Sequence, residues 1–175
     1  MKYLIASDLH GSSSSASFLV EKFNVLNCDK LILLGDILYH GPRNDLPLNY
    51  NPKQVISLLN PMSDNIIAIN GNCDAEVDQM VLKFKLNKSL DLTLNNIEFH
   101  LEHGHHLDEY DNSKYVILYG HTHLKRIEKV GKNIFLNPGS ITIPKDGILG
   151  SYMLLENNEI SLYDINDTLL NKILL

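Results

Sequence analysis

Four apolar runs along this chain end directly in short clusters of residue types that bind metal ions. The clusters are Asp8-Leu9-His10, Gly35-Asp36, Gly71-Asn72-Cys73-Asp74 and Gly120-His121-Thr122-His123. A short, continuous apolar run is typical of a strand that is buried on both faces of a parallel sheet. Because the carboxyl ends of parallel strands meet at one edge of a sheet, side chains from all four clusters can gather there. The sequence therefore predicts an α/β fold with one polar site, and a metal centre is the simplest interpretation of that site.

The size and composition are those of an ordinary soluble globular protein. The 175 residues fit a single domain, 1–175, and no internal repeat or linker divides them. The net charge of −6 argues against a basic surface that would hold a long nucleic acid. No apolar run approaches the roughly 20 residues that cross a bilayer, and the N-terminus turns polar too soon for a signal peptide. We therefore expect a cytoplasmic protein with no membrane partner, and no disulfide between Cys28 and Cys73.

The spacing of apolar residues predicts strands and helices that alternate in the first half of the chain. We expect strands at 2–7, 30–35 and 65–70, and amphipathic helices at 16–26 and 52–60. The lysine-rich stretch 83–88 is expected to be a solvated turn. Short strands follow at 89–94, 97–102, 115–119, 125–130, 133–136, 151–156 and 159–164. Helices early and strands late indicate two sheets packed on each other and flanked by helices.

The polar clusters combine oxygen and imidazole ligands. Asp8 and His10 stand two residues apart, as do His121 and His123, so each pair can face one pocket where a strand ends. A carboxylate after the second run, Asp36, can bridge two cations because each of its oxygens has lone pairs to offer. Such a mixed shell suits manganese, iron or zinc better than magnesium or calcium. Taken singly, each aspartate is more often a helix cap or a turn residue, but four clusters at strand ends together favour a metal centre.

The order of the clusters resembles the five motifs of the calcineurin-like metallophosphoesterase superfamily. The matching stretches are Asp8-Leu9-His10, Gly35-Asp36, Gly71-Asn72-Cys73-Asp74, His103-Gly104-His105 and Gly120-His121-Thr122-His123. A closer resemblance, to the bacterial YfcE group of phosphodiesterases, rests on residues 34–44, residues 71–80 and Asn137-Pro138-Gly139-Ser140. The resemblance implies an α/β fold of the four-layer αββα sandwich type, in which two mixed β-sheets are flanked by helices.

The resemblance also implies two divalent metal ions held by seven side chains. Asp8, His10, Asp36 and His123 would bind one ion, and Asp36, Asn72, His103 and His121 the other, with Asp36 bridging. Manganese is the expected metal, with nickel, zinc or iron as alternatives. Two cations about 3.5–4 Å apart can share a water, lower its pKa and hold the resulting hydroxide in line with phosphorus. The implied activity is hydrolysis of small phosphodiesters, with diesters preferred to monoesters.

Asp36 and Asn72 are candidates for catalysis as well as for metal binding. Two neighbours of Asn72 in the third cluster, Cys73 and Asp74, are further candidates. Most members of the superfamily carry a histidine where Cys73 stands, whereas the YfcE group shares the cysteine. A thiol is a poor general acid, which favours substrates with good leaving groups. A role for Cys73 as covalent nucleophile is disfavoured, because the metal ions already supply a nucleophile. Asp74 is expected to orient the imidazole ligands.

Lys125 stands where members of the resembled family usually carry proline. We expect this difference to alter a loop but no metal ligand.

Substrate choice is expected to lie in the segment 39–50. His40 and Arg43 could reach a phosphate at the rim of the site, and an arginine can bind two phosphate oxygens at once. A structural salt bridge explains Arg43 equally well. His105 is a further candidate for substrate binding, and a surface position without a role is its alternative.

A protein-binding scaffold is the alternative function. The retromer subunit that resembles this fold uses it mainly to hold partners, so the fold alone does not decide activity. All seven implied ligand positions carry competent side chains in this chain, which favours an enzyme. The β-rich second half could also supply an edge strand for self-association, and we expect a homo-oligomer.

Overall fold

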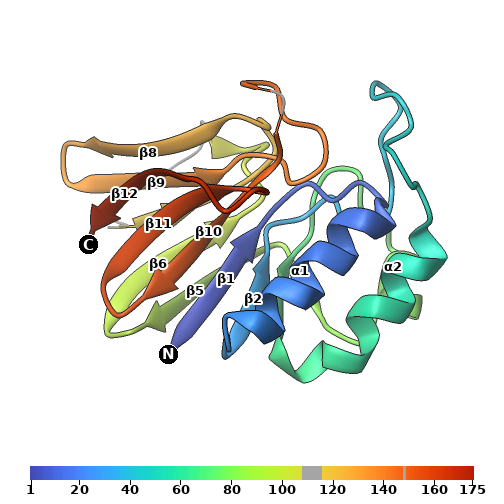
Figure 1. The fold of residues 1–175 in the computed structure, drawn as a ribbon, viewed down its shortest axis with the longest axis horizontal. Helices are drawn as coiled ribbons and strands as arrows, with labels where there is room; N and C mark the ends of the chain where they lie inside the picture. The colour runs from blue at the N-terminus through green and yellow to red at the C-terminus, as the bar shows by residue number, and fades with distance from the viewer. Residues whose placement is uncertain (108–115, 148) are drawn as a thin grey trace.

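The computed structural model describes residues 1–107, 116–147 and 149–175 as two β-sheets with helices on one side (Figure 1). The strands of the larger sheet are β1 Lys2–Ala6, β2 Lys30–Leu33, β3 Ile66–Ile69, β4 Leu86–Asn87, β10 Ser151–Glu156, β11 Glu159–Asp164 and β12 Leu169–Leu174. Those of the smaller sheet are β5 Ser89–Leu94, β6 Ile97–Glu102, β7 Val116–Leu118, β8 Lys125–Val130 and β9 Asn133–Pro138. The strand orders are β12-β11-β10-β1-β2-β3-β4 and β5-β6-β7-β9-β8. Both sheets mix parallel and antiparallel pairs.

Two helices cover the outer face of the larger sheet, α1 (Ser13–Val25) and α2 (Pro52–Leu59) (Figure 1). α1 begins after Ser12 and α2 begins after Asn51. Each of these two side chains accepts a hydrogen bond from the backbone N–H three residues further on, which is the geometry of an N-cap. The caps satisfy N–H groups that have no partner within the helix, and they fix where the two helices start.

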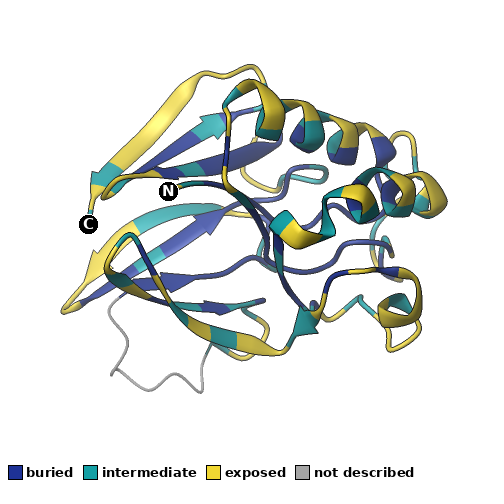
Figure 2. Ribbon diagram, turned by 90° about the horizontal axis from the view of Figure 1, so that it is seen from below, coloured by how far each residue is buried: buried dark blue, intermediate teal, exposed yellow. Residues whose placement is uncertain are grey.

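Two apolar cores hold the layers together (Figure 2). Leu19 of α1 and Leu31 of β2 lie in the core between the helices and the larger sheet. Ile32 of β2 and Phe99 of β6 lie in the core between the two sheets. Since neighbouring side chains of β2 point to opposite faces, this strand is buried on both sides, which accounts for its uninterrupted apolar sequence.

The predicted α/β architecture with two mixed sheets is confirmed, and the elements differ mainly at their ends. The helix expected at 16–26 begins three residues earlier because Ser12 caps it. The stretch 83–88, expected to be a solvated turn, instead contains β4, which pairs in parallel with β3, and Phe84 beside it is buried. Of the strand predicted at 115–119, residue 115 lies outside the described residues.

Three further elements were not predicted among the described residues. They are α3 (Asp78–Val81), the 3-10 helix Asn60–Asn65 and β12. None of the described helices is both long enough and apolar enough to cross a membrane.

The parallel strands place the polar clusters side by side. β1, β2 and β3 run parallel in the larger sheet, and β6, β7 and β9 do so in the smaller one. Where β1 and β2 end, the Asp8 N–H donates to the Gly35 carbonyl at 3.1 Å. Across the two sheets, the His121 N–H donates to Asp8 Oδ2, also at 3.1 Å. The carboxyl ends of strands from both sheets therefore converge on one region.

Candidate metal centre

Five ionisable residues are buried together where these strands end. Asp8, His10, Asp36, His103 and His123 are each at most 3% exposed. Burying so many ionisable groups is costly unless they are paired with each other or with a cation. Of the other two predicted ligands, His121 is partly exposed and Asn72 is exposed. The structure thus brings the predicted ligands of both halves of the chain to one place.

Backbone carbonyls fix the orientation of three imidazoles. The Nδ1 contacts are His10 to Tyr39 O at 3.0 Å, His103 to Leu34 O at 2.6 Å and His123 to Ile143 O at 2.7 Å. A carbonyl can only accept, so each Nδ1 carries the hydrogen. In the neutral form of each ring the lone pair is then on Nε2, where a metal ion would accept it.

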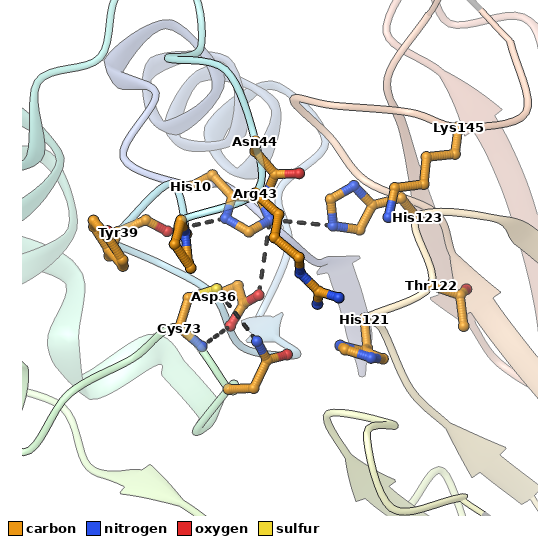
Figure 3. Close-up of a pocket in the computed structure, with 13 residues that line it drawn as sticks. His10, Asp36, Tyr39, Arg43, Asn44, Cys73, His121, Thr122, His123 and Lys145 are labelled. Carbon is orange, nitrogen blue, oxygen red and sulfur yellow. Dashed lines mark hydrogen bonds and ion pairs between the residues drawn. The ribbon is translucent and has the colours of Figure 1, made fainter.

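The first group of donors is incomplete without a cation. His10 Nε2 and His123 Nε2 face each other at 3.1 Å (Figure 3). Asp8 Oδ1 lies 3.4 Å from His123 Nε2 and 3.8 Å from His10 Nε2. This oxygen is buried and has no hydrogen-bond partner among the described residues. Two lone pairs and an unpartnered carboxylate oxygen that converge in this way fit a divalent cation.

The second group shares Asp36 with the first. His103 Nε2 lies 3.1 Å from Asn72 Oδ1 and 3.4 Å from Asp36 Oδ2. The same Asp36 oxygen lies 3.8 Å from His10 Nε2, so it stands between the two groups. The ring of His121 packs 5.1 Å from the ring of His103, centroid to centroid. This arrangement supports a carboxylate that bridges two ions.

The electrostatics of the second group favour positive charge. Burial alone would lower the pKa of His103, but its contacts with Asp36 and the nearby charge of Asp8 raise that pKa to about 9. Burial alone would likewise raise the pKa of Asp36. The hydrogen bond with His103, the charge of that ring and the Cys73 N–H outweigh it and hold the pKa of Asp36 well below its usual range. Asp36 is therefore ionised at neutral pH.

We expected Asp74 to orient the imidazole ligands. The structure shows instead that Asp74 binds backbone N–H groups. Its carboxylate accepts the N–H groups of Asp36 at 2.8 Å, Ile37 at 2.7 Å and Gly71 at 2.8 Å. Burial raises the pKa of Asp74 to about 6, although these three bonds favour the charged form. Asp74 does not orient the imidazoles because backbone carbonyls already bind their Nδ1 atoms. Its three backbone contacts join the second cluster to the third.

Two glycines allow these clusters to approach each other. Gly35 has φ +101°, and a Cβ there would lie 2.6 Å from His103 Nδ1. A Cβ on Gly71 would lie 2.1 Å from Asp36 Oδ1. Neither position has room for a side chain, which explains why glycine precedes Asp36 and Asn72.

Five of the seven predicted ligands have left-handed backbone conformations. The φ values are +58° at Asp8, +50° at His10, +54° at Asp36, +65° at His121 and +60° at His123. Aspartate and histidine adopt this region more readily than most residues, at a cost of about 1 kcal/mol or more each. Sharp turns at these positions aim the side chains at the centre, and the surrounding packing supports the strain.

The Asn137-Pro138-Gly139-Ser140 stretch anchors the loops that carry the ligands. The buried Ser140 hydroxyl donates to the Asp8 carbonyl at 2.8 Å. The amide of Asn137 donates to the Gly120 carbonyl at 2.7 Å. This motif therefore joins the cluster after β1 to the cluster after β7.

An open cavity of about 650 Å³ lies over the candidate centre. It is lined by His10, Asp36, Tyr39, Gly41, Pro42, Arg43, Asn44, Asn72, Cys73, His121, Thr122, His123 and Lys145. The side chain of Arg43 extends toward the cavity (Figure 3) and forms no ion pair within the described parts of the chain. The salt-bridge interpretation of Arg43 thus has no support here. Lys145 was not predicted, because no motif surrounds it.

Two predicted substrate-binding residues lie outside this cavity lining. His40 packs edge-on against Tyr39 and Tyr50, with ring centroids 4.6 and 5.2 Å apart. His105 is exposed beside the second group, 5.5 Å from the ring of His103. Their closest ring neighbours are aromatic and imidazole side chains, and a role in substrate binding stays a prediction for both residues.

Cys73 lines the cavity as a neutral thiol. Its sulfur lies within 4.8 Å of ligand atoms of His10 and Asp36. Burial and the negative charge of Asp36 raise the pKa of the thiol to about 12. A thiol in this state is a poor nucleophile at neutral pH.

Comparisons with known sequences agree over most of the chain. The sequence model of the calcineurin-like phosphoesterase superfamily domain matches residues 1–159. Phosphodiesterase YfcE of Escherichia coli strain K12 is 41% identical over 172 residues, which cover 95% of this chain and 94% of YfcE. A phosphodiesterase of Methanocaldococcus jannaschii is 28% identical over 166 residues, or 85% of this chain and 92% of that protein.

Solved structures give the same result. The structure of YfcE, a phosphoesterase from E. coli, matches with a TM-score of 0.92 at 37% identity and covers 99% of both chains. Vps29 from Entamoeba histolytica matches with a TM-score of 0.66 at 20% identity over 100% of this chain and 99% of Vps29, which shows the fold alone. The chain, with its two mixed sheets and its ligand clusters at the strand ends, belongs to the calcineurin-like phosphoesterase superfamily.

Proposed function

We propose that this protein is a metal-dependent phosphodiesterase that hydrolyses small phosphodiesters at a centre of two divalent cations. The observation that carries the proposal is the set of donors: three imidazoles with anchored Nδ1 atoms turn Nε2 toward two buried carboxylates. The two relatives that are named phosphodiesterases, at 41% and 28% identity, support the choice of substrate.

The proposed ligands are those that the family resemblance implies. Asp8, His10, Asp36 and His123 would hold one ion, and Asp36, Asn72, His103 and His121 the other. These seven side chains would hold the ions, and the ions, when bound, would supply a water-derived nucleophile at neutral pH and charge stabilisation at the phosphoryl oxygens. We propose manganese because it accepts both oxygen and imidazole ligands.

The protein's own contribution is to hold the donors and the substrate in place. Backbone carbonyls fix the imidazoles, so little reorganisation is needed when the reaction occurs. The Cys73 N–H donates to Asp36 Oδ1 at 2.8 Å and leaves Oδ2 for the centre. Arg43, at the rim, can bind an anionic oxygen of the substrate.

A protein-binding scaffold is the less favoured alternative. Its structural support is the likeness to Vps29 at 20% identity, which extends to the fold only. The full set of donors on this chain has no purpose in simple docking. Organisation as one domain and self-association both stay predictions.

Hydrolysis of matched chromogenic esters tests the proposed activity. With Mn²⁺ supplied, we expect kcat/KM for bis(p-nitrophenyl) phosphate to exceed that for p-nitrophenyl phosphate about tenfold. The reason is that no histidine stands at position 73 to assist a dianionic monoester. Release of p-nitrophenolate measures both rates, with protein-free Mn²⁺ as the control. Cleavage of the monoester alone would contradict the proposal.

Cys73→Ser is expected to change kcat/KM for the diester by no more than about threefold. The substitution keeps the side chain small and keeps the backbone N–H of residue 73 that donates to Asp36 Oδ1. Steady-state kinetics of the two proteins measure the effect. A loss comparable to that of a metal-ligand variant would show instead that the sulfur takes part in the reaction.

A further inference from the structure

Two positively charged side chains face the cavity without being candidate metal ligands. Arg43 comes from the segment between β2 and α2, and Lys145 from the segment between β9 and β10. Figure 3 shows both side chains extending toward the same cavity. Both are exposed, and neither forms an ion pair within residues 1–107, 116–147 and 149–175. Two such cations at one cavity are suited to bind an anionic group.

The segment that carries Lys145 is tied to the candidate centre. The Lys145 N–H donates to the His123 carbonyl at 3.2 Å. Ile143 accepts from His123 Nδ1 through its carbonyl, and the Ile143 N–H donates to the Ser140 hydroxyl at 2.8 Å. Lys145 is therefore presented by a loop whose backbone is held in place.

An ion pair between Lys125 and Asp146 holds the same loop and does not involve Lys145. Asp146 accepts the backbone N–H of Lys125 at Oδ2 and the Lys125 ammonium at Oδ1, both at 2.6 Å. Both contacts come from donors of the same residue, so Lys125 holds Asp146 through its backbone and its side chain. The carboxylate nearest to Lys145 in sequence is thus already paired with Lys125.

We propose that Lys145 and Arg43 together bind a second anionic group of the substrate, of the phosphate class, and that the Lys125–Asp146 pair positions Lys145 for this contact. The inference rests on the proposed function, because it names the substrate class of the same site. A terminal phosphate carries a charge of about −1.5 to −2 at pH 7, which matches two cations. The guanidinium can bind two of its oxygens, and the ammonium a third.

Binding measurements test the inference without requiring turnover. Isothermal titration of the Mn²⁺-loaded protein compares thymidine 5′-monophosphate with thymidine 3′,5′-bisphosphate. We expect the wild type to bind the bisphosphate about tenfold more tightly, as one charge-assisted contact allows. Lys145→Gln should reduce this preference to about twofold. Lys129→Gln, an exposed lysine variant on β8, is the matched control and should keep the full preference.

The positioning role of the ion pair has its own test. Asp146→Ala should lose part of the preference for the bisphosphate, and Asp146→Glu should retain more of it. In kinetics with the p-nitrophenyl ester of thymidine 5′-phosphate, with and without a 3′-phosphate, Asp146→Ala should raise KM for the phosphate-bearing ester and leave kcat nearly unchanged. A fall in kcat for both esters would indicate that Asp146 has a purely structural role. It would overturn the proposal that the Lys125–Asp146 pair positions Lys145.

The outcomes separate the inference from the proposed function. A bisphosphate preference that is equal in the wild type and Lys145→Gln, or absent from the wild type, would overturn the inference. A preference that depends on Lys145, together with no hydrolysis of either ester, would overturn the proposed function and support the inference.

Discussion

Asp36→Asn is expected to lower kcat/KM for a diester by about 10³-fold or more, equivalent to about 4 kcal/mol of transition-state stabilisation. Asp36 Oδ2 stands near both rings, 3.8 Å from His10 Nε2 and 3.4 Å from His103 Nε2, and its negative charge holds the two donor groups together. An asparagine keeps the acceptor for the Cys73 N–H but places a neutral amide in the centre. The loss should therefore arise from the chemistry of the site and not from unfolding.

Three measurements on Asp36→Asn separate these causes. Steady-state kinetics give the loss of activity, elemental analysis gives the metal content, and circular dichroism gives the thermal midpoint. Asp64→Asn, exposed in the 3-10 helix Asn60–Asn65, is the matched control and should behave as the wild type. A loss below about tenfold would rule out the bridging role of Asp36.

Removal of metal is expected to abolish diester hydrolysis and to lower the thermal midpoint. Without a cation, the buried Asp8 Oδ1 has no hydrogen-bond partner in the part of the chain that the structure describes, and the Nε2 atoms of His10 and His123 face each other. A ligand at a hundred times its Kd stabilises the folded state by about 2.7 kcal/mol, which is about 5–10 °C for a chain of this size. We expect the midpoint to rise by such an amount when Mn²⁺ is restored.

The test uses chelated protein that is then supplied in turn with manganese, nickel, zinc or magnesium. Activity and thermal midpoint should rise together, and most strongly with manganese. In Asp8→Asn the same additions should raise the midpoint much less, since the amide carries no negative charge and has only one oxygen to offer. A midpoint that none of the four metals moves would contradict the assignment of this site.

Much of the fold follows from local sequence patterns. The apolar runs at β1, β2 and β3 mark strands buried on two faces, and the caps at Ser12 and Asn51 are residues with known preferences. The weaker elements depend on tertiary contacts. β4 has only two residues and forms because it pairs with β3, a contact that no local pattern reports.

In the candidate site too, some features follow from local sequence patterns and others depend on tertiary contacts. Ligand types at strand ends identify which side chains meet, because topology brings those ends together. Supporting contacts are less predictable, since backbone carbonyls orient the imidazoles and a backbone atom has no sequence signature. Asp74 was given the wrong partner for this reason. Lys145 is near the cavity only because the loop folds back through Lys125 and Asp146.

The left-handed turns at Asp8, His10, Asp36, His121 and His123 restrict how this protein can evolve. Exchange of one ligand for another must satisfy coordination chemistry and also tolerate a positive φ. Asparagine and glycine meet the second demand, whereas valine, isoleucine and threonine do not. Descendants that abandon the chemistry would therefore drift toward asparagine or glycine at these five positions, and the turns themselves would outlast the activity.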